Sequence, residues 1–520
     1  MLYAKTQSLE DAYLYAQALQ ANGEASRSVR LLERAGLFVN GNLEQRVEAV
    51  LLAAQSLSTL GEWSEALALT ESVLPPEDDD DAGWQSLVQS IEPRENVIHP
   101  VARLCVLRGR GYDETSNPTR AGVYWKRALK IDANAVEALD LLLGKSMLTP
   151  SEAYELIMSL DMEMEWLRDL YLSRVSVPAE EQEPALDENN QKMPAKVSIQ
   201  RDVTCAFDKL WSVYKLHKAP EALALAAIRS YRQYDLKASL AYCQELASMD
   251  PLCPSASFVH IATLVALDLK RILFQLAHEW VEASPKSAWA WFAVGSYYYA
   301  CARYHVAQRH YMRATRLDPQ STESWIAFGC AFAQCDESDQ ALASFRAAQR
   351  LAPASHVPLL YMGMEYLRTN HLVLARHFLM AAHKSSGGDP LCLHELGVAD
   401  YKRGEYATAA VWFHRALVAS CHKESEDPVD LVQDVFWEPT LFNLGQCYRK
   451  SKQYVEAERC FEKCLALCPV RCIVCWIDLL SWMHLLLILR CFFFVSTGKR
   501  VVFLSFGLYE ALGWKCRQGH

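Results

Sequence analysis

The chain has 520 residues, a formal net charge of −10 and a pI near 5.9. This acidic balance excludes a protein whose main role is to clamp nucleic-acid phosphates, because that role requires a basic face. Only 21 glycines and 20 prolines interrupt a chain that is 51% hydrophobic, which favours long helices over many tight turns and predicts an all-α fold.

The 17 cysteines are scattered through apolar stretches, where reduced cysteine behaves as a small buried residue. No charged-then-apolar leader opens the sequence. Disulfide frameworks belong mostly to short chains that lack a sizeable core. We therefore expect reduced thiols and a location in the nucleus and cytoplasm.

The first predicted domain, residues 1–176, contains irregular helical hairpins. Helical patterns cover residues 12–37 and 61–74, and residues 109–128 repeat the spacing of small and aromatic residues that is clearer later in the chain. The run EDDDD at residues 77–81 predicts a solvated surface loop, with an acidic docking segment as the alternative.

A short stretch of this domain has the appearance of a phosphate-binding loop. Gly144, Lys145 and Ser146 match the end of that motif, but Leu139 stands where its first glycine is required and no strand precedes it. Nucleotide binding is therefore not expected. Residues 177–200 are polar and contain proline, which predicts a linker to a second domain at residues 201–469.

The second domain has a constant period of 34 residues. Tryptophan, glycine, tyrosine, alanine and proline at fixed offsets within that period are typical of the tetratricopeptide repeat, a pair of antiparallel helices. Stacked pairs of this kind form a superhelix, an α-solenoid. The residues that mark the period are Pro251, Pro285, Pro319 and Pro353, and Gly295, Gly329, Gly363 and Gly397.

The small residues of each unit predict where its two helices approach closely, and the aromatic residues fill the space that remains. A proline after the second helix ends the unit. The predicted repeat core consists of Trp291, Gly295, Tyr298, Ala307, Tyr311, Trp325, Gly329, Ala341, Phe345, Gly363, Gly397 and Gly445.

The last clear unit departs from the period. Gly445 follows Gly397 by 48 residues, so 14 extra residues predict an extended helix or an exposed loop around CHKESEDPVD. In the preceding unit, His394 and Glu395 begin like a zinc-protease helix, but Val398 stands where the second histidine is needed. We expect no metal and no cofactor there.

The regular pattern stops at Pro469, and residues 470–520 form an apolar tail of a different kind. Residues 473–495 are long enough to span a bilayer, yet Asp478 and Arg490 lie inside this stretch. We expect a retained intron or a faulty gene model, with a membrane anchor or a soluble extension as alternatives, so a membrane partner is not favoured.

Three cysteines at the start of the tail have the spacing of an iron–sulfur loop. Cys468, Cys472 and Cys475 follow the pattern C-x3-C-x2-C, in which three thiolates can ligate a cubane cluster. Enzymes with that loop place it after the first strand of a βα barrel, whereas here it follows helical hairpins. We therefore expect reduced thiols rather than a cluster.

Aromatic residues cluster in the first helix of the clearest unit, AWFAVGSYYY at residues 290–299. Helical spacing places Trp291 and Tyr298 between helices and places Phe292, Ser296 and Tyr299 on another face. In stacked hairpins the first helices line a concave surface that binds extended peptides or helices. We therefore expect a partner groove rather than a stacking platform for nucleic-acid bases.

Several stretches resemble one family closely: AWFAVGSYYY, LLYMGMEYLRTN at residues 359–370, HELGVADY at residues 394–401, WEPTLFNLGQCYRK at residues 437–450, and EALDLLLGKSMLT at residues 137–149. Over residues 10–469 the chain is similar to the tetratricopeptide scaffold subunit six of the anaphase-promoting complex, a cell-cycle ubiquitin ligase. This resemblance implies a subunit that is not itself an enzyme and that binds the other tetratricopeptide subunits.

The resemblance also implies two more specific contacts. N-terminal repeats form a homodimer in that family, although its members have one more hairpin upstream of the position of Leu2. The C-terminal superhelix encloses the N-terminal segment of a small accessory subunit. By this resemblance the groove would be lined by Phe292, Ser296, Tyr299, Glu323, Ile326, Cys330, Leu360, Met364, Leu367, His394, Val398, Tyr401, Phe442, Asn443, Gln446 and Arg449.

A generic tetratricopeptide adaptor that binds a chaperone tail is the alternative function. Such adaptors hold a terminal carboxylate with a clamp of lysine, arginine and asparagine. The predicted groove is mainly aromatic and aliphatic, with Asn443 and Arg449 only in its last unit. This composition favours the scaffold.

Overall fold

The computed structural model describes residues 8–39, 42–75, 81–91, 98–162, 164–175, 196–421, 429, 432 and 435–467. The chain divides into two compact units, Met1–Val175 and Ser176–His520. Every regular element in the described ranges is a helix, which confirms the all-α prediction. No helix there has the length and apolar character needed to cross a bilayer. The apolar tail and residues 77–80 of the acidic run lie outside these ranges.

The first unit consists of helices that pack mainly against their neighbours in the chain. Gly109 of its regular hairpin faces Trp125, just as the glycines of the second unit face their partners. Its helices are α2 (Leu9–Ala21), α3 (Ala25–Arg34), α4 (Leu43–Leu60), α5 (Trp63–Glu71), α6 (Asp81–Gln89), α7 (Pro100–Glu114), α8 (Pro118–Ile131), α9 (Val136–Gly144), α10 (Pro150–Ser159) and α11 (Glu165–Arg174).

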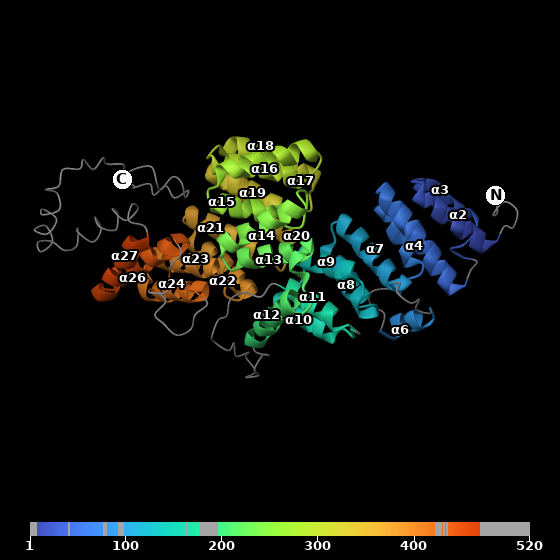
Figure 1. The fold of residues 1–520 in the computed structure, drawn as a ribbon, viewed down its shortest axis with the longest axis horizontal. Coiled ribbons are helices and arrows are strands. Elements are labelled where there is room, and N and C mark those ends of the chain that lie inside the picture. The colour runs from blue at the N-terminus through green and yellow to red at the C-terminus, as the bar shows by residue number, and fades with distance from the viewer. Residues whose placement is uncertain are drawn as a thin grey trace, which may run out of the picture. The chain divides into compact units, whose positions relative to one another are not determined.

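The second unit is a series of helical hairpins that follow one another from green to red in Figure 1. It contains α12 (Lys196–Ser212), η1 (Leu216–Lys218), α13 (Pro220–Arg232), α14 (Leu236–Met249), α15 (Ser257–Ala266), α16 (Lys270–Ala283), α17 (Ala288–Ala300), α18 (Tyr304–Leu317), α19 (Thr322–Gln334), α20 (Ser338–Leu351), α21 (Val357–Arg368), α22 (Leu372–Ser386), α23 (Pro390–Arg403), α24 (Tyr406–Cys421), η2 (Val435–Trp437), α26 (Glu438–Lys450) and α27 (Tyr454–Leu467).

The start of this unit differs from the sequence prediction. Helix α12 begins at Lys196, so the last five residues of the predicted linker, 196–200, are helical. Ile199, Val203 and Ala206 are buried at helical spacing. This apolar stripe stabilises the helix despite the polar residues around it.

Close approach of the two helices explains the glycines of the repeat. A Cβ atom on Gly295 would lie 2.7 Å from two ring atoms of Tyr311, which is closer than carbon atoms can approach. Gly329 has the same relation to Phe345, and Gly363, Gly397 and Gly445 face Leu379, Phe413 and Phe461. In every case the partner stands 16 positions later, so one packing geometry is repeated along the unit.

The turn inside each hairpin contains one residue in the left-handed region of backbone conformation. These residues recur every 34 positions from Tyr234 to Gly404, and only the last of them is glycine. They are Tyr234 (φ 62°), Asp268 (φ 54°), Ala302 (φ 58°), Asp336 (φ 62°), Asn370 (φ 62°) and Gly404 (φ 86°). The hairpin geometry therefore extends into units that lack the signature glycine.

The enlarged junction is partly described. Helix α24 has 16 residues, two more than α18 and α20. Val429, Val432 and Trp437 beyond it are buried in the core formed by α21–α27. Side chains of the insertion therefore contribute to the core of the unit.

Candidate functional site

Six of the sixteen predicted groove residues are buried within the folded chain, which corrects their assignment to an open surface. Ser296 shares a hydrogen bond of 3.0 Å with the Tyr311 hydroxyl. The ring of Phe292 packs edge-on against Phe258 at 4.9 Å. The six buried residues are Phe292, Ser296, Leu360, Leu367, Val398 and Gln446.

Stacking explains this correction. The first helix of a hairpin contacts its own second helix and also the helices of the neighbouring hairpins, as α17 contacts α15, α16, α18 and α19. Both faces beside the hairpin interface are therefore covered, and only a narrow strip of each first helix remains accessible. A sequence argument based on two faces of an isolated hairpin overestimates this strip.

The predicted repeat-core residues differ in how deeply they are buried. Gly295, Ala307, Tyr311, Gly329, Ala341, Phe345, Gly363, Gly397 and Gly445 are buried. Trp291, Tyr298 and Trp325 are half-buried. The imidazole of His310 lies between the rings of Trp291 and Tyr298, with ring centroids 5.9 and 5.2 Å away. These aromatics pack the hairpin at its outer edge.

Ten predicted groove residues keep accessible surface: Tyr299, Glu323, Ile326, Cys330, Met364, His394, Tyr401, Phe442, Asn443 and Arg449. Burial, followed by the charge of Cys330, raises the pKa of Tyr299 well above its usual value. Water can reach Glu323, yet burial of its carboxyl among neighbouring groups raises its pKa. These shifts are those expected of polar groups inside a concave surface, where water is reduced but present. The roles of these ten residues in partner binding stay predictions.

A long-range contact closes the second unit on itself. The Tyr234 hydroxyl donates a hydrogen bond of 2.8 Å to Asp389 Oδ1, across a sequence separation of 155 residues. The same ring packs edge-on against Trp437 at 5.1 Å and against Phe436 at 5.5 Å. Figure 1 shows α13 and α14 beside α21 and α23, as this contact requires. We call Tyr234, Asp389, Phe436 and Trp437 the clasp.

The degenerate first hairpin also lies close to the first helices of later hairpins. Burial lowers the pKa of Arg232, and the charge of Glu323 on α19 opposes this shift. The charge of Cys330, followed by burial, raises the pKa of Tyr361 on α21, and Tyr231 on α13 adds to it. Charged and aromatic side chains of α13, α19 and α21 therefore lie within electrostatic range of one another.

Two adjacent residues of α23 have opposite pKa shifts with the same cause. Burial lowers the pKa of His394 to about 4, and its Nδ1 shares a hydrogen bond of 2.9 Å with Thr440. Burial raises the pKa of Glu395 to about 7, against the opposing charge of Lys402. Oε2 of Glu395 is buried without a hydrogen-bond partner. Both side chains are therefore held towards their neutral forms.

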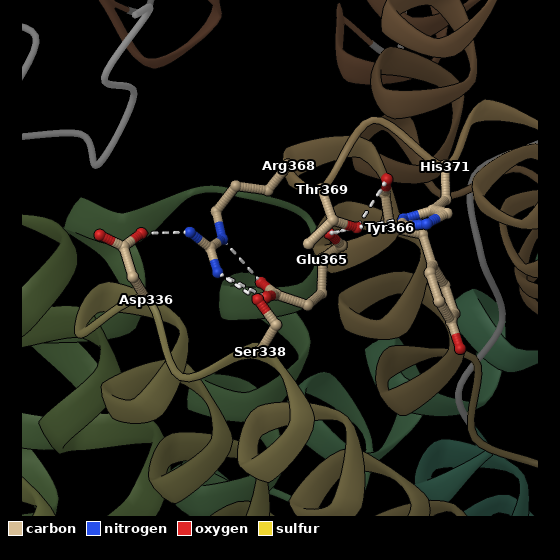
Figure 2. Close-up of polar contacts among 7 residues, drawn as sticks. All are labelled: Asp336, Ser338, Glu365, Tyr366, Arg368, Thr369 and His371. Atoms are coloured by element: carbon tan, nitrogen blue, oxygen red, sulfur yellow. Dashed lines mark hydrogen bonds and ion pairs between the residues drawn. The ribbon is translucent and has the colours of Figure 1, made fainter.

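An ion-pair network fixes two successive hairpins to each other (Figure 2). Arg368 donates from Nε and Nη2 to the two carboxylate oxygens of the buried Glu365, at 3.0 and 2.7 Å. It also contacts Asp336 and Ser338 at the turn between α19 and α20. Lys145, which resembled a phosphate-loop lysine in the sequence, likewise pairs with Asp113. These cations stabilise the scaffold.

Two thiols of the second unit, those of Cys330 and Cys447, are poor nucleophiles. Burial raises the pKa of Cys330 to about 12 and that of Cys447 to about 12, so both are protonated near neutral pH. None of the cysteines in the described ranges forms a disulfide. Cys468, Cys472 and Cys475, for which we expect reduced thiols, lie outside those ranges.

Sequence reasoning missed the residues that close the interior. Tyr231, Arg232 and Tyr234 belong to a hairpin without the signature glycine, and Asp389 lies in a loop. Tyr234 adopts the positive φ that recurs in the turns of the later hairpins, and this backbone conformation cannot be read from the sequence.

Family models match three parts of the chain. The tetratricopeptide repeat models match residues 290–321 and 439–469, and the model described as anaphase-promoting complex, cyclosome, subunit 3 matches residues 1–73. The matches to the repeat models confirm the tetratricopeptide prediction.

Curated relatives match most of the chain. Anaphase-promoting complex subunit 6 of Arabidopsis thaliana is 31% identical over 471 residues, which is 89% of this chain and 82% of that protein. The cell division cycle protein 16 homolog of Homo sapiens is 32% identical over 475 residues, 88% of this chain and 71% of that protein. A solved structure, the crystal structure of the APC/C hetero-tetramer Cut9-Hcn1, matches with a TM-score of 0.70 and 27% identity, over 90% of this chain and 82% of that one.

Proposed function

The chain belongs to the anaphase-promoting complex subunit 6 family, and we propose that it acts as a non-catalytic scaffold whose second unit encloses a segment of a small accessory subunit. As a subunit of this complex it supports cell-cycle ubiquitination by binding other subunits. The observation that supports the enclosed segment is the clasp, because it joins the turn between α13 and α14 to residues before α23 and α26 and so favours a surface that curves around a partner.

The structural match supports the kind of partner. The matched solved structure is named as a hetero-tetramer of Cut9 with a second protein, Hcn1. An interior lined by Tyr299, Tyr361 and Glu323 suits an extended peptide, whose backbone offers hydrogen-bond donors and acceptors to polar side chains between apolar anchors. The chaperone-tail adaptor is not favoured by any of these matches.

A capture experiment tests this interior. The double variant Tyr299→Ala with Asn443→Ala should bind the accessory subunit about tenfold more weakly or worse, because aromatic anchors dominate such contacts. The control is Val373→Ala with Val455→Ala, which alters two residues of second helices that are 83% and 78% exposed. Circular dichroism should show that both proteins are folded. Unchanged capture by the folded first variant would refute the proposal.

Purification from dividing cells tests the wider assignment. The tagged chain should carry the other subunits of the ligase with it, whereas chaperones alone would overturn the scaffold function. We place the chain in the nucleus and cytoplasm, which fluorescence microscopy checks.

Homodimerisation through the first unit is also part of the proposal. Helix α2 exposes Leu14 and Tyr15, two apolar side chains that a second copy would cover. Sedimentation of the purified chain should give twice the monomer mass. A monomer at micromolar concentration would count against it.

A further inference from the structure

Three side chains with metal-binding atoms meet beside the clasp. The donor atoms of His356, Asp389 and Cys392 all lie within 4.8 Å of one another. His356 Nε2 is 3.5 Å from Asp389 Oδ2. The residues come from the N-terminal ends of α21 and α23, the first helices of two successive hairpins. The superhelix therefore brings one nitrogen, one oxygen and one sulfur donor to a single point.

These side chains do not perform the usual task of their positions. His356 and Asp389 are the N-cap residues of α21 and α23, yet neither side chain accepts a hydrogen bond from its own helix. An aspartate at that position ordinarily caps the helix and gains about 1 kcal/mol of stability by doing so. Asp389 instead turns to Tyr234 and His356.

The spacing suits a small divalent ion. Zinc binds histidine nitrogen and carboxylate oxygen at about 2.0–2.2 Å and sulfur at about 2.3 Å, so tetrahedral donors stand roughly 3.3–3.7 Å apart. The distance from His356 Nε2 to Asp389 Oδ2 falls in that interval. Cys392 Sγ lies within 4.8 Å of both of these atoms, so a bound ion would draw the three donors closer together.

The charges suit the same ion. Asp389 contacts His356 through Oδ2 and Tyr234 through Oδ1, so both of its carboxylate oxygens have polar partners. The hydrogen bond from Tyr234 to Oδ1 orients the carboxylate and leaves Oδ2 for the ion. A carboxylate and a thiolate together balance the charge of a divalent cation.

We propose that His356, Asp389 and Cys392 form a zinc site in which solvent supplies the fourth ligand. Nε2, Oδ2 and Sγ donate electron pairs to the ion, and the Cys392 thiol releases its proton to solvent as the sulfur–zinc bond forms. The site joins the loops before α21 and α23 and fixes Asp389 of the clasp. This zinc site is a property separate from the scaffold function, since the metal content of the chain and its capture of the accessory subunit are measured in different experiments.

Metal content of the full chain tests this site. Cys468, Cys472, Cys475, Cys491 and Cys516 are first replaced by serine, so that thiolates after residue 467 do not contribute. After dialysis against buffered zinc, this parent chain should retain one equivalent by elemental analysis. Cobalt(II) in place of zinc should give the absorption of a tetrahedral ion with one thiolate ligand. Cys392→Ser should lower the affinity by about a hundredfold, the upper end of the loss seen when a partner of a metal ligand is removed.

Matched controls separate the site from general binding. Cys447→Ser removes another buried thiol of the same unit, and His377→Ala removes an exposed histidine; both should keep the full equivalent. Less than one equivalent in the parent chain, or an unchanged equivalent in Cys392→Ser, would overturn the proposal. If Cys392→Ser fails to fold, the cobalt spectrum of the parent decides alone, since the lack of a thiolate band excludes Cys392 as a ligand.

Discussion

The glycine at the centre of each hairpin offers the sharpest test of how this scaffold is held together. Gly295 lies in α17, and an added Cβ would stand 2.7 Å from Cδ1 and Cε1 of Tyr311 on α18. The Tyr311 ring cannot easily yield, because it is 3% exposed and its hydroxyl is bonded to Ser296. Gly295→Ala must therefore move the two helices apart or force Tyr311 out of its rotamer.

Two opposing effects set the size of the change. Overpacking a closely packed site costs about 1–3 kcal/mol. Alanine in a helix interior gains about 1 kcal/mol over glycine. Because the added Cβ would stand 2.7 Å from two ring atoms, we expect an overpacking cost of about 2–3 kcal/mol, and therefore a net loss of about 1–2 kcal/mol in the free energy of unfolding of the second unit. The same steric argument applies to Gly329, Gly363, Gly397 and Gly445.

Urea unfolding, followed by circular dichroism, measures the loss of stability. A chain of two units need not unfold in one step, so hydrogen exchange is also needed to locate the loss in α17 and α18. Gly144→Ala is the matched control. Gly144 ends α9 and is exposed, and its Cβ would meet no atom within 4 Å, so this variant should be neutral or slightly stabilised. Equal stability of Gly295→Ala and wild type, beside a normal control, would refute the close-approach reasoning.

Two further predictions concern buried charge. Arg368→Met should lower the free energy of unfolding in urea by about 3 kcal/mol, because it leaves the Glu365 carboxylate, only 3% exposed, without its cation. The control Arg27→Met breaks an exposed pair with Glu24 and should change stability by less than about 1 kcal/mol. Equal losses in the two variants would contradict the argument. The pKa of Glu395 is raised to about 7, so the folded chain holds a proton that the unfolded chain loses near pH 4.5. The protonated carboxyl therefore stabilises the folded chain fully below pH 4.5, and this contribution is lost as pH rises towards 7. Glu395→Gln should reduce the fall in unfolding free energy between these two pH values by roughly 3 kcal/mol. An unchanged dependence of stability on pH would show that Glu395 titrates normally.

The architecture could be predicted from the sequence because close packing restricts residue type. Where Gly295 meets Tyr311, only glycine fits, so the period is visible in the letters themselves. The turn inside the hairpin does not restrict residue type in this way. Tyr234, Asp268 and Ala302 all adopt positive φ at the same place in successive hairpins, but nothing in their chemistry identifies it. The degenerate hairpins were therefore harder to recognise than the regular ones.

The groove could be predicted only in part, since its surface depends on distant contacts. Helical spacing cannot show that Phe258 of the preceding hairpin covers Phe292, or that Ser296 is buried against Tyr311 of its own hairpin. Tyr299, one turn further along α17, keeps accessible surface. The contact of Tyr234 with Asp389 arises from a complete turn of the superhelix, and no local pattern spans 155 residues.

The clasp also gives a reason for the irregular spacing late in the chain. A strict 34-residue period would begin the next first helix soon after α24 ends. The 14 extra residues between α24 and α26 instead include η2 with the aromatic rings of Phe436 and Trp437. Phe436 and Trp437 pack against Tyr234, and Trp437 is buried in the core of α21–α27. The insertion thus joins the last hairpins of the superhelical turn to its first one. Regular packing stabilises the scaffold, and the departures from regularity at Tyr234, Asp389 and Trp437 close it around its interior.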